Sequence, residues 1–291
     1  MKQNTREFPD KKIALKSDLY KMQRRPMHPQ IVINDGYQGI KIIAPWSEEI
    51  QASIPFTKGY NSQGVIKEWC FRADGKAVLI LNDESRAACW LSLEVGNQSY
   101  DVECPPLRRI MDLRYLWDED SLWLTGGKSY NFFKLQWHED IPVFVSSTAI
   151  ESRRSHREWN RTLDRLSPID CNVLRVESDR SQMLYHNFAE HPGKIGVANW
   201  RDETVWSITA PQEVPRLAAF SRRLFVMHEY EVHCFNEHGE LETVYPAPQD
   251  FHYRDLDTIP AQSGYPPALV LGCSSLNDPE FCQILVYRIE N

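Results

Sequence analysis

Residues 78–102 read VLILNDESRAACWLSLEVGNQSYDV, and this stretch decides the fold. It holds an apolar run, a polar turn, a second apolar run around Trp90, a turn that contains Gly96, and a short third run that ends at Val102. Short apolar runs rich in β-branched and aromatic residues, separated by polar turns, predict consecutive antiparallel strands. A further candidate strand at 66–71 precedes the stretch. The two together predict one four-stranded unit.

The same pattern begins six times along the chain, at residues 31, 78, 122, 183, 224 and 268, so the offsets are 47, 44, 61, 41 and 44 residues. Four of these offsets are close to the ~40–45 residues of a four-stranded propeller blade. Further candidate strands precede the later units at 66–71, 110–115, 172–176 and 216–220. The sequence therefore predicts an all-β fold, a six-bladed β-propeller that forms a single domain over residues 1–291.

An aromatic residue followed by acidic residues marks the end of the third strand in several units: Trp46-Ser-Glu-Glu, Trp137-His-Glu-Asp, Trp200-Arg-Asp-Glu and Phe235-Asn-Glu-His. Together with the period, this resembles the Trp-Asp signature that ends the third strand of WD40 repeats. The resemblance covers residues 31–291, lacks the Gly-His half of that signature, and has six units where WD40 proteins usually have seven. A seven-bladed propeller and a β-sandwich with turns at similar spacing are the alternatives.

The N-terminal segment, residues 1–30, is predicted to complete the last unit. That unit reaches its third strand at 281–288 and the sequence ends at Asn291, so the unit lacks a fourth strand of its own. A sheet without its outer strand leaves an unpaired edge. We expect the strand-like run at 12–19 to supply the closing outer strand.

The 61-residue offset reflects an insertion at 146–170, within which about residues 152–166 are predicted to form a helix. Ser155 and Glu158 fit a capping box, and Trp159, Leu163 and Leu166 form one apolar stripe. Arginines occupy the other faces of this helix. Arginine is enriched at interface hot spots, so the helix is a candidate partner contact. The alternative is a helix that only covers a gap through Trp159. The candidate residues are Arg153, Arg154, Arg157, Trp159, Arg161 and Arg165.

A second candidate surface is acidic. In a propeller, the turns between first and second strands and those between third and fourth strands share one face. The sequence predicts many carboxylates in these turns, which suit a basic partner. The alternative is that acidic residues are good turn formers on a solvated rim. The candidate residues are Asp118, Glu119, Asp120, Glu139, Asp140, Asp202 and Glu203, with Glu48, Glu49, Asp74, Asp179 and Glu237 on the same face.

Composition restricts the partner and the compartment. The net charge of −7 argues against a nucleic-acid partner. Residues 1–21 lack the apolar core of a signal peptide, and no run approaches the ~18 apolar residues of a membrane span. The seven cysteines are scattered, odd in number and without a CxxC pair, which indicates free thiols in a reducing compartment. We expect a monomeric cytoplasmic protein that binds another protein and no membrane.

Two short motifs suggest chemistry but lack the context for it. Residues 125–129, TGGKS, resemble the end of a phosphate-binding loop but fall in a hairpin turn and lack its first glycine. His228 and His233 are five residues apart on two predicted strands around a turn, whereas the HExxH zinc motif needs a spacing of four on a helix. The sequence therefore predicts no cofactor and no metal site.

The leading hypothesis is a non-catalytic protein-binding propeller, such as a dedicated inhibitor of the immunity type or an adaptor. The alternative is a propeller hydrolase that acts on a sugar or lactone in the central channel, with Arg72, Asp112, Arg114 and Arg175 as candidate channel residues. A scaffold within a larger assembly is a third hypothesis. Fold by itself does not distinguish these functions.

Overall fold

The structure is a computed structural model of the chain, and it describes residues 4–56, 66–72, 74–82, 88–94, 98–102, 110–116, 121–126, 131–138, 141–146, 171–175, 182–187, 194–199, 204–209, 216–262 and 264–290. All the regular secondary structure of these residues is β-strand. The predicted helix at about 152–166 lies outside the described residues. In the described part of the chain there is thus no helix of the length and apolarity needed to cross a membrane.

The strands of the described residues form six sheets, and within each sheet the strands that are neighbours in the chain pair antiparallel. We number the sheets in chain order. Sheet 1 is β3–β6 (Met22–Arg24, Ile31–Asp35, Gly39–Ala44, Glu49–Pro55), sheet 2 is β7–β10 (Ile66–Phe71, Ala77–Asn82, Ala88–Ser92, Ser99–Val102) and sheet 3 is β11–β14 (Ile110–Leu116, Ser121–Gly126, Asn131–His138, Ile141–Ser146). Sheet 4 is β15–β18 (Cys171–Arg175, Gln182–Asn187, Lys194–Asn199, Thr204–Thr209), sheet 5 is β19–β22 (Leu217–Phe220, Arg223–Met227, Glu231–Phe235, Leu241–Pro246) and sheet 6 is β23–β25 with β2 (Phe251–Ile259, Ala268–Ser275, Phe281–Arg288, Lys11–Lys16).

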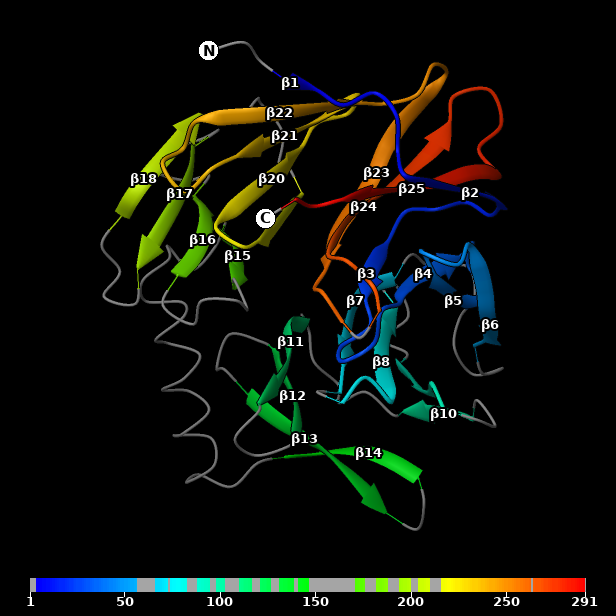
Figure 1. The fold of residues 1–291 in the computed structure, drawn as a ribbon. Helices are drawn as coiled ribbons and strands as arrows, with labels where there is room; N and C mark the ends of the chain where they lie inside the picture. Colours follow the sequence, from blue (N-terminus) through cyan, green and yellow to red (C-terminus); the bar gives the residue numbers. More distant parts are fainter. Residues whose placement is uncertain are drawn as a thin grey trace.

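The sheets follow one another around a common centre (Figure 1). The first strands of adjacent sheets are neighbours there, since β23 contacts both β19 and β3, β11 contacts β7, and β15 contacts β19. Radial sheets of four strands whose first strands line the centre are the architecture of a β-propeller. The predicted all-β propeller is confirmed, and the six sheets coincide with the six sequence units.

The N-terminal segment supplies the outer strand of sheet 6. β2 lies antiparallel to β25, with Lys11 opposite Val286 and Lys16 opposite Phe281. Its side chains alternate, so Ile13 and Leu15 are buried while Lys12 and Ala14 are exposed. The strand ends at Lys16, three residues before the end of the predicted run, because the chain turns inward there.

The N-terminal segment also forms two strands that the sequence did not predict. β3 provides the first strand of sheet 1, next to the centre. The two-residue strand β1 (Asn4–Thr5) pairs in parallel with β22 and adds a fifth strand to sheet 5. Both strands are too short and too polar to stand out from the loops around them. The segment therefore joins three sheets.

The aromatic residues that end the third strands of sheets 1, 3 and 5 contact the preceding sheet. The indole N–H of Trp46 in sheet 1 donates to the Pro266 carbonyl in sheet 6 at 3.1 Å. The Trp137 ring in sheet 3 lies edge-to-face against Trp90 and Tyr100 of sheet 2, with both ring centroids at 5.6 Å. Phe235 of sheet 5 packs against a cluster that includes Ile195 of sheet 4. Aromatic side chains suit this position because they bury a large area and retain a polar or quadrupolar contact.

The core consists of layers between adjacent sheets. One cluster joins sheets 6 and 1, a second joins sheets 1 and 2, and a third joins sheets 5 and 6. A sheet that is covered on both faces needs apolar residues at successive positions and not at alternate ones. β24 illustrates this, since all of its residues from Ala268 to Ser275 are buried.

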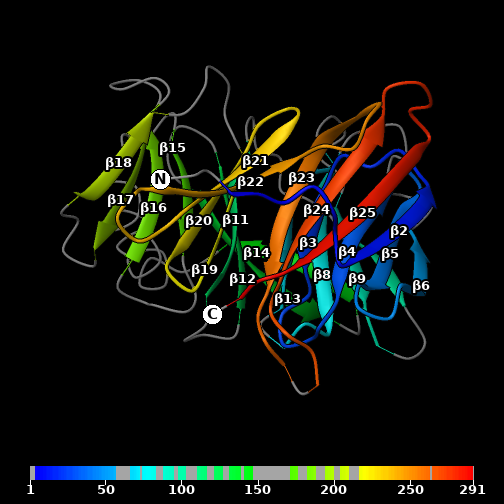
Figure 2. The same ribbon diagram turned by 45° about the horizontal axis from the view of Figure 1, so that its top comes forward.

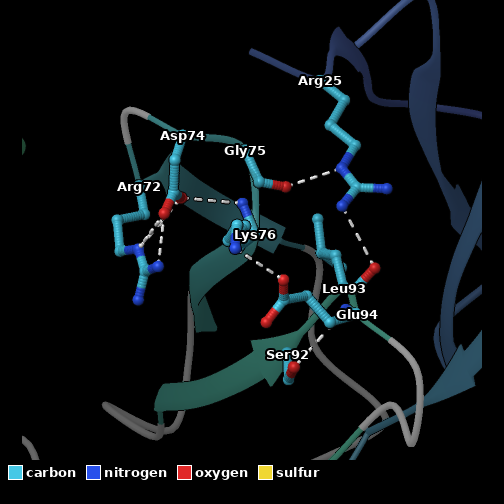
Figure 3. Close-up of polar contacts among 8 residues, drawn as sticks. All are labelled: Arg25, Arg72, Asp74, Gly75, Lys76, Ser92, Leu93 and Glu94. Carbon is cyan, nitrogen blue, oxygen red and sulfur yellow. Dashed lines mark hydrogen bonds and ion pairs between the residues drawn. The ribbon is translucent and has the colours of Figure 1, made fainter. Parts of the chain in front are cut away.

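Arg25 is a buried cation between sheets 1 and 2 (Figure 3). Its Nε donates to the Gly75 carbonyl at 2.6 Å, and its Nη2 donates to the Leu93 carbonyl at 3.1 Å. Its Nη1 donates to Gln30 Oε1 at 2.8 Å. A β-carbon on Gly75 would lie 2.1 Å from the Pro26 carbonyl oxygen, and the φ angle of Gly75 is +70°. Glycine at this position therefore allows the two sheets to approach closely enough for Arg25 to bridge them.

We expect Arg25→Ala to lower the free energy of unfolding by about 2–3 kcal/mol, because it leaves the two carbonyls without their charged donor. Arg72→Ala is the matched control, since the half-exposed Arg72 pairs with Asp74 on its own turn. This change should cost about 0.5 kcal/mol or less. Urea unfolding followed by tryptophan fluorescence measures both values. Equal losses for the two variants would show that Arg25 does not join the sheets.

Candidate functional site

The residues predicted for the partner site lie outside the described part of the chain. This applies to Arg153, Arg154, Arg157, Trp159, Arg161 and Arg165 of the inserted segment. It also applies to the acidic residues Asp118, Glu119, Asp120, Glu139, Asp140, Asp202 and Glu203. These assignments stay predictions.

Three described acids of the predicted acidic face are paired with cations of the same chain, whereas Glu49 accepts from Ser47 Oγ at 3.2 Å and has no ion-pair partner among the described residues. We call this face, made of the turns between first and second and between third and fourth strands, the A–B face. Three of its acidic side chains illustrate the pairing. The ion pairs are Glu48 with Lys11 at 2.7 Å, Asp74 with Arg72, and Glu237 with Arg222 at 3.0 Å. Exposed pairs of this kind contribute little to stability, but they cancel much of the negative field at this face.

The opposite face, which we call the B–C face, holds three loops that lie together. Residues 228–230 join β20 to β21, residues 247–250 join β22 to β23, and residues 276–280 join β24 to β25. Figure 2 shows these three connections along one side of the molecule, in yellow, orange and red. We call these three loops the platform.

Backbone hydrogen bonds join the platform loops to one another. The Ala247 N–H donates to the Tyr230 carbonyl at 2.7 Å, and the Leu276 N–H donates to the Asp250 carbonyl at 2.8 Å. The Tyr253 N–H, at the start of β23, donates to the Glu229 carbonyl at 2.7 Å. Loops that are tied through their backbones hold their side chains in one arrangement. The platform is therefore a preformed surface across sheets 5 and 6.

Local side-chain contacts shape the third loop. Ser275 Oγ accepts from the N–H groups of Asn277 and Asp278, at 3.1 and 3.2 Å. The Asp278 carboxylate in turn accepts from the Glu280 N–H at 3.1 Å. Serine and aspartate favour turns because their oxygens bond nearby backbone donors. This loop is consequently folded by its own residues and presents Leu276 outward.

The platform combines exposed apolar side chains with carboxylates. Tyr230 is 51% exposed and Leu276 is 53% exposed. Large apolar side chains exposed within one surface often mark a contact site. Four exposed acids surround them, namely Glu229, Asp250, Asp278 and Glu280. The last three form no ion pair with another described residue.

Two histidines lie beside the platform. The rings of His228 and His233 are 4.3 Å apart between centroids, and His233 Nε2 is 2.8 Å from Glu231 Oε1. Burial lowers the pKa of His228, and the nearby His233 lowers it further. His233 lies on β21 as predicted, whereas His228 follows the end of β20 and belongs to the loop that joins the two strands. Among the described residues, no group of three or more His, Cys, Asp or Glu side chains has the geometry of a metal site.

Two carboxylates on β23 lie near the centre of the ring but are engaged by the backbone. Asp255 accepts from the N–H groups of Met22 and Leu256, at 2.6 and 2.9 Å, and pairs with Arg216. Asp257 accepts from the N–H groups of Arg24 and Thr258, at 2.8 and 2.7 Å. Burial raises the pKa of both carboxyls, while the hydrogen bonds and nearby arginines lower it. Carboxylates with this many donors join β23 to the open edge of β3.

The candidate channel residues of the hydrolase hypothesis find no support in the described residues. Arg72 forms an ion pair with Asp74 on the A–B face. The side chains of Asp112, Arg114 and Arg175 lie outside the described part of the structure.

Five described cysteines, Cys70, Cys89, Cys234, Cys273 and Cys282, are free thiols. Burial raises the pKa of Cys234, Cys273 and Cys282 to about 12 in each case. The thiolate is the reactive form of cysteine, so these three are inert at neutral pH. They serve as small apolar residues of the core.

The sequence analysis did not predict the platform. The available signal was an isolated apolar residue inside an acidic turn, as in Leu276-Asn-Asp-Pro-Glu. That signal is weak alone, because single exposed apolar residues are common on protein surfaces. Only the contact between the three loops distinguishes this exposed apolar residue from the isolated ones that are common on protein surfaces.

No protein-family model and no curated protein sequence matches the chain. Solved structures of WD40 β-propellers do match. Sqt1 of Saccharomyces cerevisiae has a TM-score of 0.58 at 11% identity, with 100% of each chain covered. The Cps50 (Swd1) β-propeller domain of Myceliophteria thermophila has a TM-score of 0.56 at 8% identity, with 98% of this chain and 100% of that chain covered. Raptor of Chaetomium thermophilum has a TM-score of 0.52 at 13% identity, with 98% of this chain and 30% of that chain covered. Together with the six sheets, these likenesses show that the chain has a β-propeller fold.

Proposed function

We propose that this chain is a non-catalytic protein-binding propeller and that the platform contacts the partner. The observation that carries this proposal is that the exposed Tyr230 and Leu276 lie on loops joined by backbone hydrogen bonds. Tyrosine is enriched at binding hot spots because it combines a large apolar area with a polar end at low entropic cost. Preformed loops add affinity because little order is lost on binding.

Within this function we propose a dedicated inhibitor, such as an immunity-type protein, or an adaptor. An inhibitor needs one partner, whereas an adaptor needs at least two, on separate surfaces. The protein would act as a monomer in the cytoplasm. The free thiols of the described core support a reducing compartment, because disulfides predominate in oxidising ones.

A photo-crosslinking amino acid placed at Tyr230 tests the site. We expect it to capture one specific protein in cells, identified by mass spectrometry, because an interface contact brings the label within bonding distance. The comparison position is Met27, which is 74% exposed on the A–B face. A different protein captured at Met27 would indicate an adaptor, and capture at Tyr230 only would indicate an inhibitor.

The function also predicts a loss of binding in a designed variant. The double change Tyr230→Ala and Leu276→Ala should weaken the captured complex by roughly tenfold or more, because it removes both apolar anchors of the surface. Both side chains are half-exposed, so the melting temperature should remain close to that of the wild type. A complex that survives this change with unaltered affinity would place the interface elsewhere.

A further inference from the structure

The two faces of the propeller differ in how their acids are used. On the A–B face, Glu48, Asp74 and Glu237 are each paired with a cation of the same chain, while Glu49 and Glu240 accept from neutral side chains. On the platform, Asp250, Asp278 and Glu280 form no ion pair with another described residue. Carboxylates without a cation partner keep their negative field at the surface. Added positive charge is therefore favoured at the platform.

The sequence of the platform strengthens this asymmetry. Residues 228–230, 247–250 and 276–280 contain four acidic residues and no lysine or arginine. Two cations lie on the strands of sheet 6. Arg254 donates to the Leu19 carbonyl at 3.1 Å, and Lys16 lies opposite Phe281 in the β2–β25 ladder. Burial lowers the pKa of His228 and of His252, so both imidazoles are neutral at pH 7.

We propose that the platform binds a basic segment of a partner protein, in which arginine or lysine side chains surround one apolar side chain seated on Tyr230 and Leu276. This inference rests on the proposed function, since it specifies what the protein-binding surface recognises. The carboxylates of Asp250, Asp278 and Glu280 would pair with the cations. The exposed Tyr230 ring offers a face for a guanidinium as well as an apolar wall. Phosphate-rich ligands such as nucleic acids and anionic membranes are repelled by the same carboxylates.

The geometry also favours a segment over an isolated ion. The carboxylates are distributed over two loops, β22–β23 and β24–β25, and the exposed apolar side chains come from the loops on both sides of the sheet 5–sheet 6 junction. A single cation could pair with the carboxylates of one loop only. An extended basic segment could contact the loops together, and the charge pairs would increase its rate of association.

Fluorescence anisotropy with a labelled synthetic peptide tests the proposal. The probe carries several arginines around a central leucine, and its control has glutamate in place of every arginine. We expect the arginine peptide to bind the full chain at low salt, and the glutamate peptide not to bind. Raising the ionic strength should weaken the complex, because salt screens exposed charges beyond a distance of about 10 Å at 0.1 M.

Two triple variants locate the binding. Asp250→Asn with Asp278→Asn and Glu280→Gln should weaken the arginine peptide by roughly tenfold, because neutral side chains no longer attract the cations. The control carries Glu48→Gln, Glu94→Gln and Glu237→Gln on the A–B face and should stay within about twofold of the wild type. Equal binding of the two peptides, or an equal loss in both triple variants, overturns the inference.

The result of the peptide experiment can be distinguished from the result of the crosslinking experiment that tests the proposed function. If the platform captures a protein through Tyr230 but the arginine peptide does not bind, the basic segment is wrong and the protein-binding function stands. If the arginine peptide binds the platform and Tyr230 captures no protein in cells, the recognition chemistry stands and the function is wrong.

Discussion

Asp255→Ala is expected to lower the free energy of unfolding by about 2–4 kcal/mol, because the N–H groups of Met22 and Leu256 lose a charged acceptor. Asp255 is 6% exposed and accepts from the Met22 N–H at 2.6 Å, across 233 residues of sequence. It also pairs with Arg216, which precedes β19. One carboxylate thus joins sheets 5, 6 and 1 next to the centre. Removing it leaves a buried N–H without an acceptor and a cation without its partner.

Urea unfolding followed by tryptophan fluorescence measures this loss. Asp278→Ala is the control, since Asp278 is an exposed acid in the β24–β25 loop, and it should change stability by about 0.5 kcal/mol or less. Asp255→Asn should fall between the two, because the carboxamide keeps an oxygen for Met22 but carries no charge for Arg216. If Asp255→Ala is no more destabilising than Asp278→Ala, the carboxylate does not hold the sheets together.

Deleting residues 1–16 is expected to lower the melting temperature by roughly 10 °C or more. The deletion removes β2, and burial of Ile13 and of Leu15 contributes about 1.5–3 kcal/mol each. Each 1 kcal/mol corresponds to about 2–4 °C for domains of this size class. The deletion also uncovers the edge of β25, and an exposed apolar edge strand pairs with other chains. Aggregation that increases with protein concentration should accompany the lower melting temperature.

A pair of double variants separates the burial from the length of the chain. Ile13→Ser with Leu15→Ser changes the inward face of β2, whereas Lys12→Ser with Ala14→Ser changes the outward face of the same strand. The inward pair should lower the melting temperature by several degrees more than the outward pair. Differential scanning calorimetry measures both. Identical melting temperatures would mean that β2 does not hold sheet 6 closed through its buried side chains.

Much of the fold was predictable from the sequence because strand formation is local. The alternation in residues such as Ile13 and Leu15 and the apolar runs such as Ala268–Ser275 depend on a period of two or on burial of both faces. The aromatic residue at the end of the third strand was also recognisable in the sequence, and the structure shows what it contacts. Trp46 and Trp137 each contact the preceding sheet.

Other elements were not predictable because their signals are weak or distant. β3 has three residues, and what stabilises its open edge is a pair of carboxylates more than 200 residues away, Asp255 and Asp257. The residues predicted for the partner site in the insertion lie outside the described part of the chain. The platform itself depends on contacts among loops that start at residues 228, 247 and 276.

The sequence by itself determined the strands, their grouping into six units and the overall excess of negative charge. These properties follow from local patterns of apolar and polar residues and from composition. The tertiary structure decided which carboxylates are neutralised and which loops lie together. Glu48 meets Lys11 while Asp250 meets no described cation, and Tyr230 lies beside Ala247. The physical reason is that charge pairing and loop contact act over a few ångströms in space, and the ring brings residues together that are far apart along the chain.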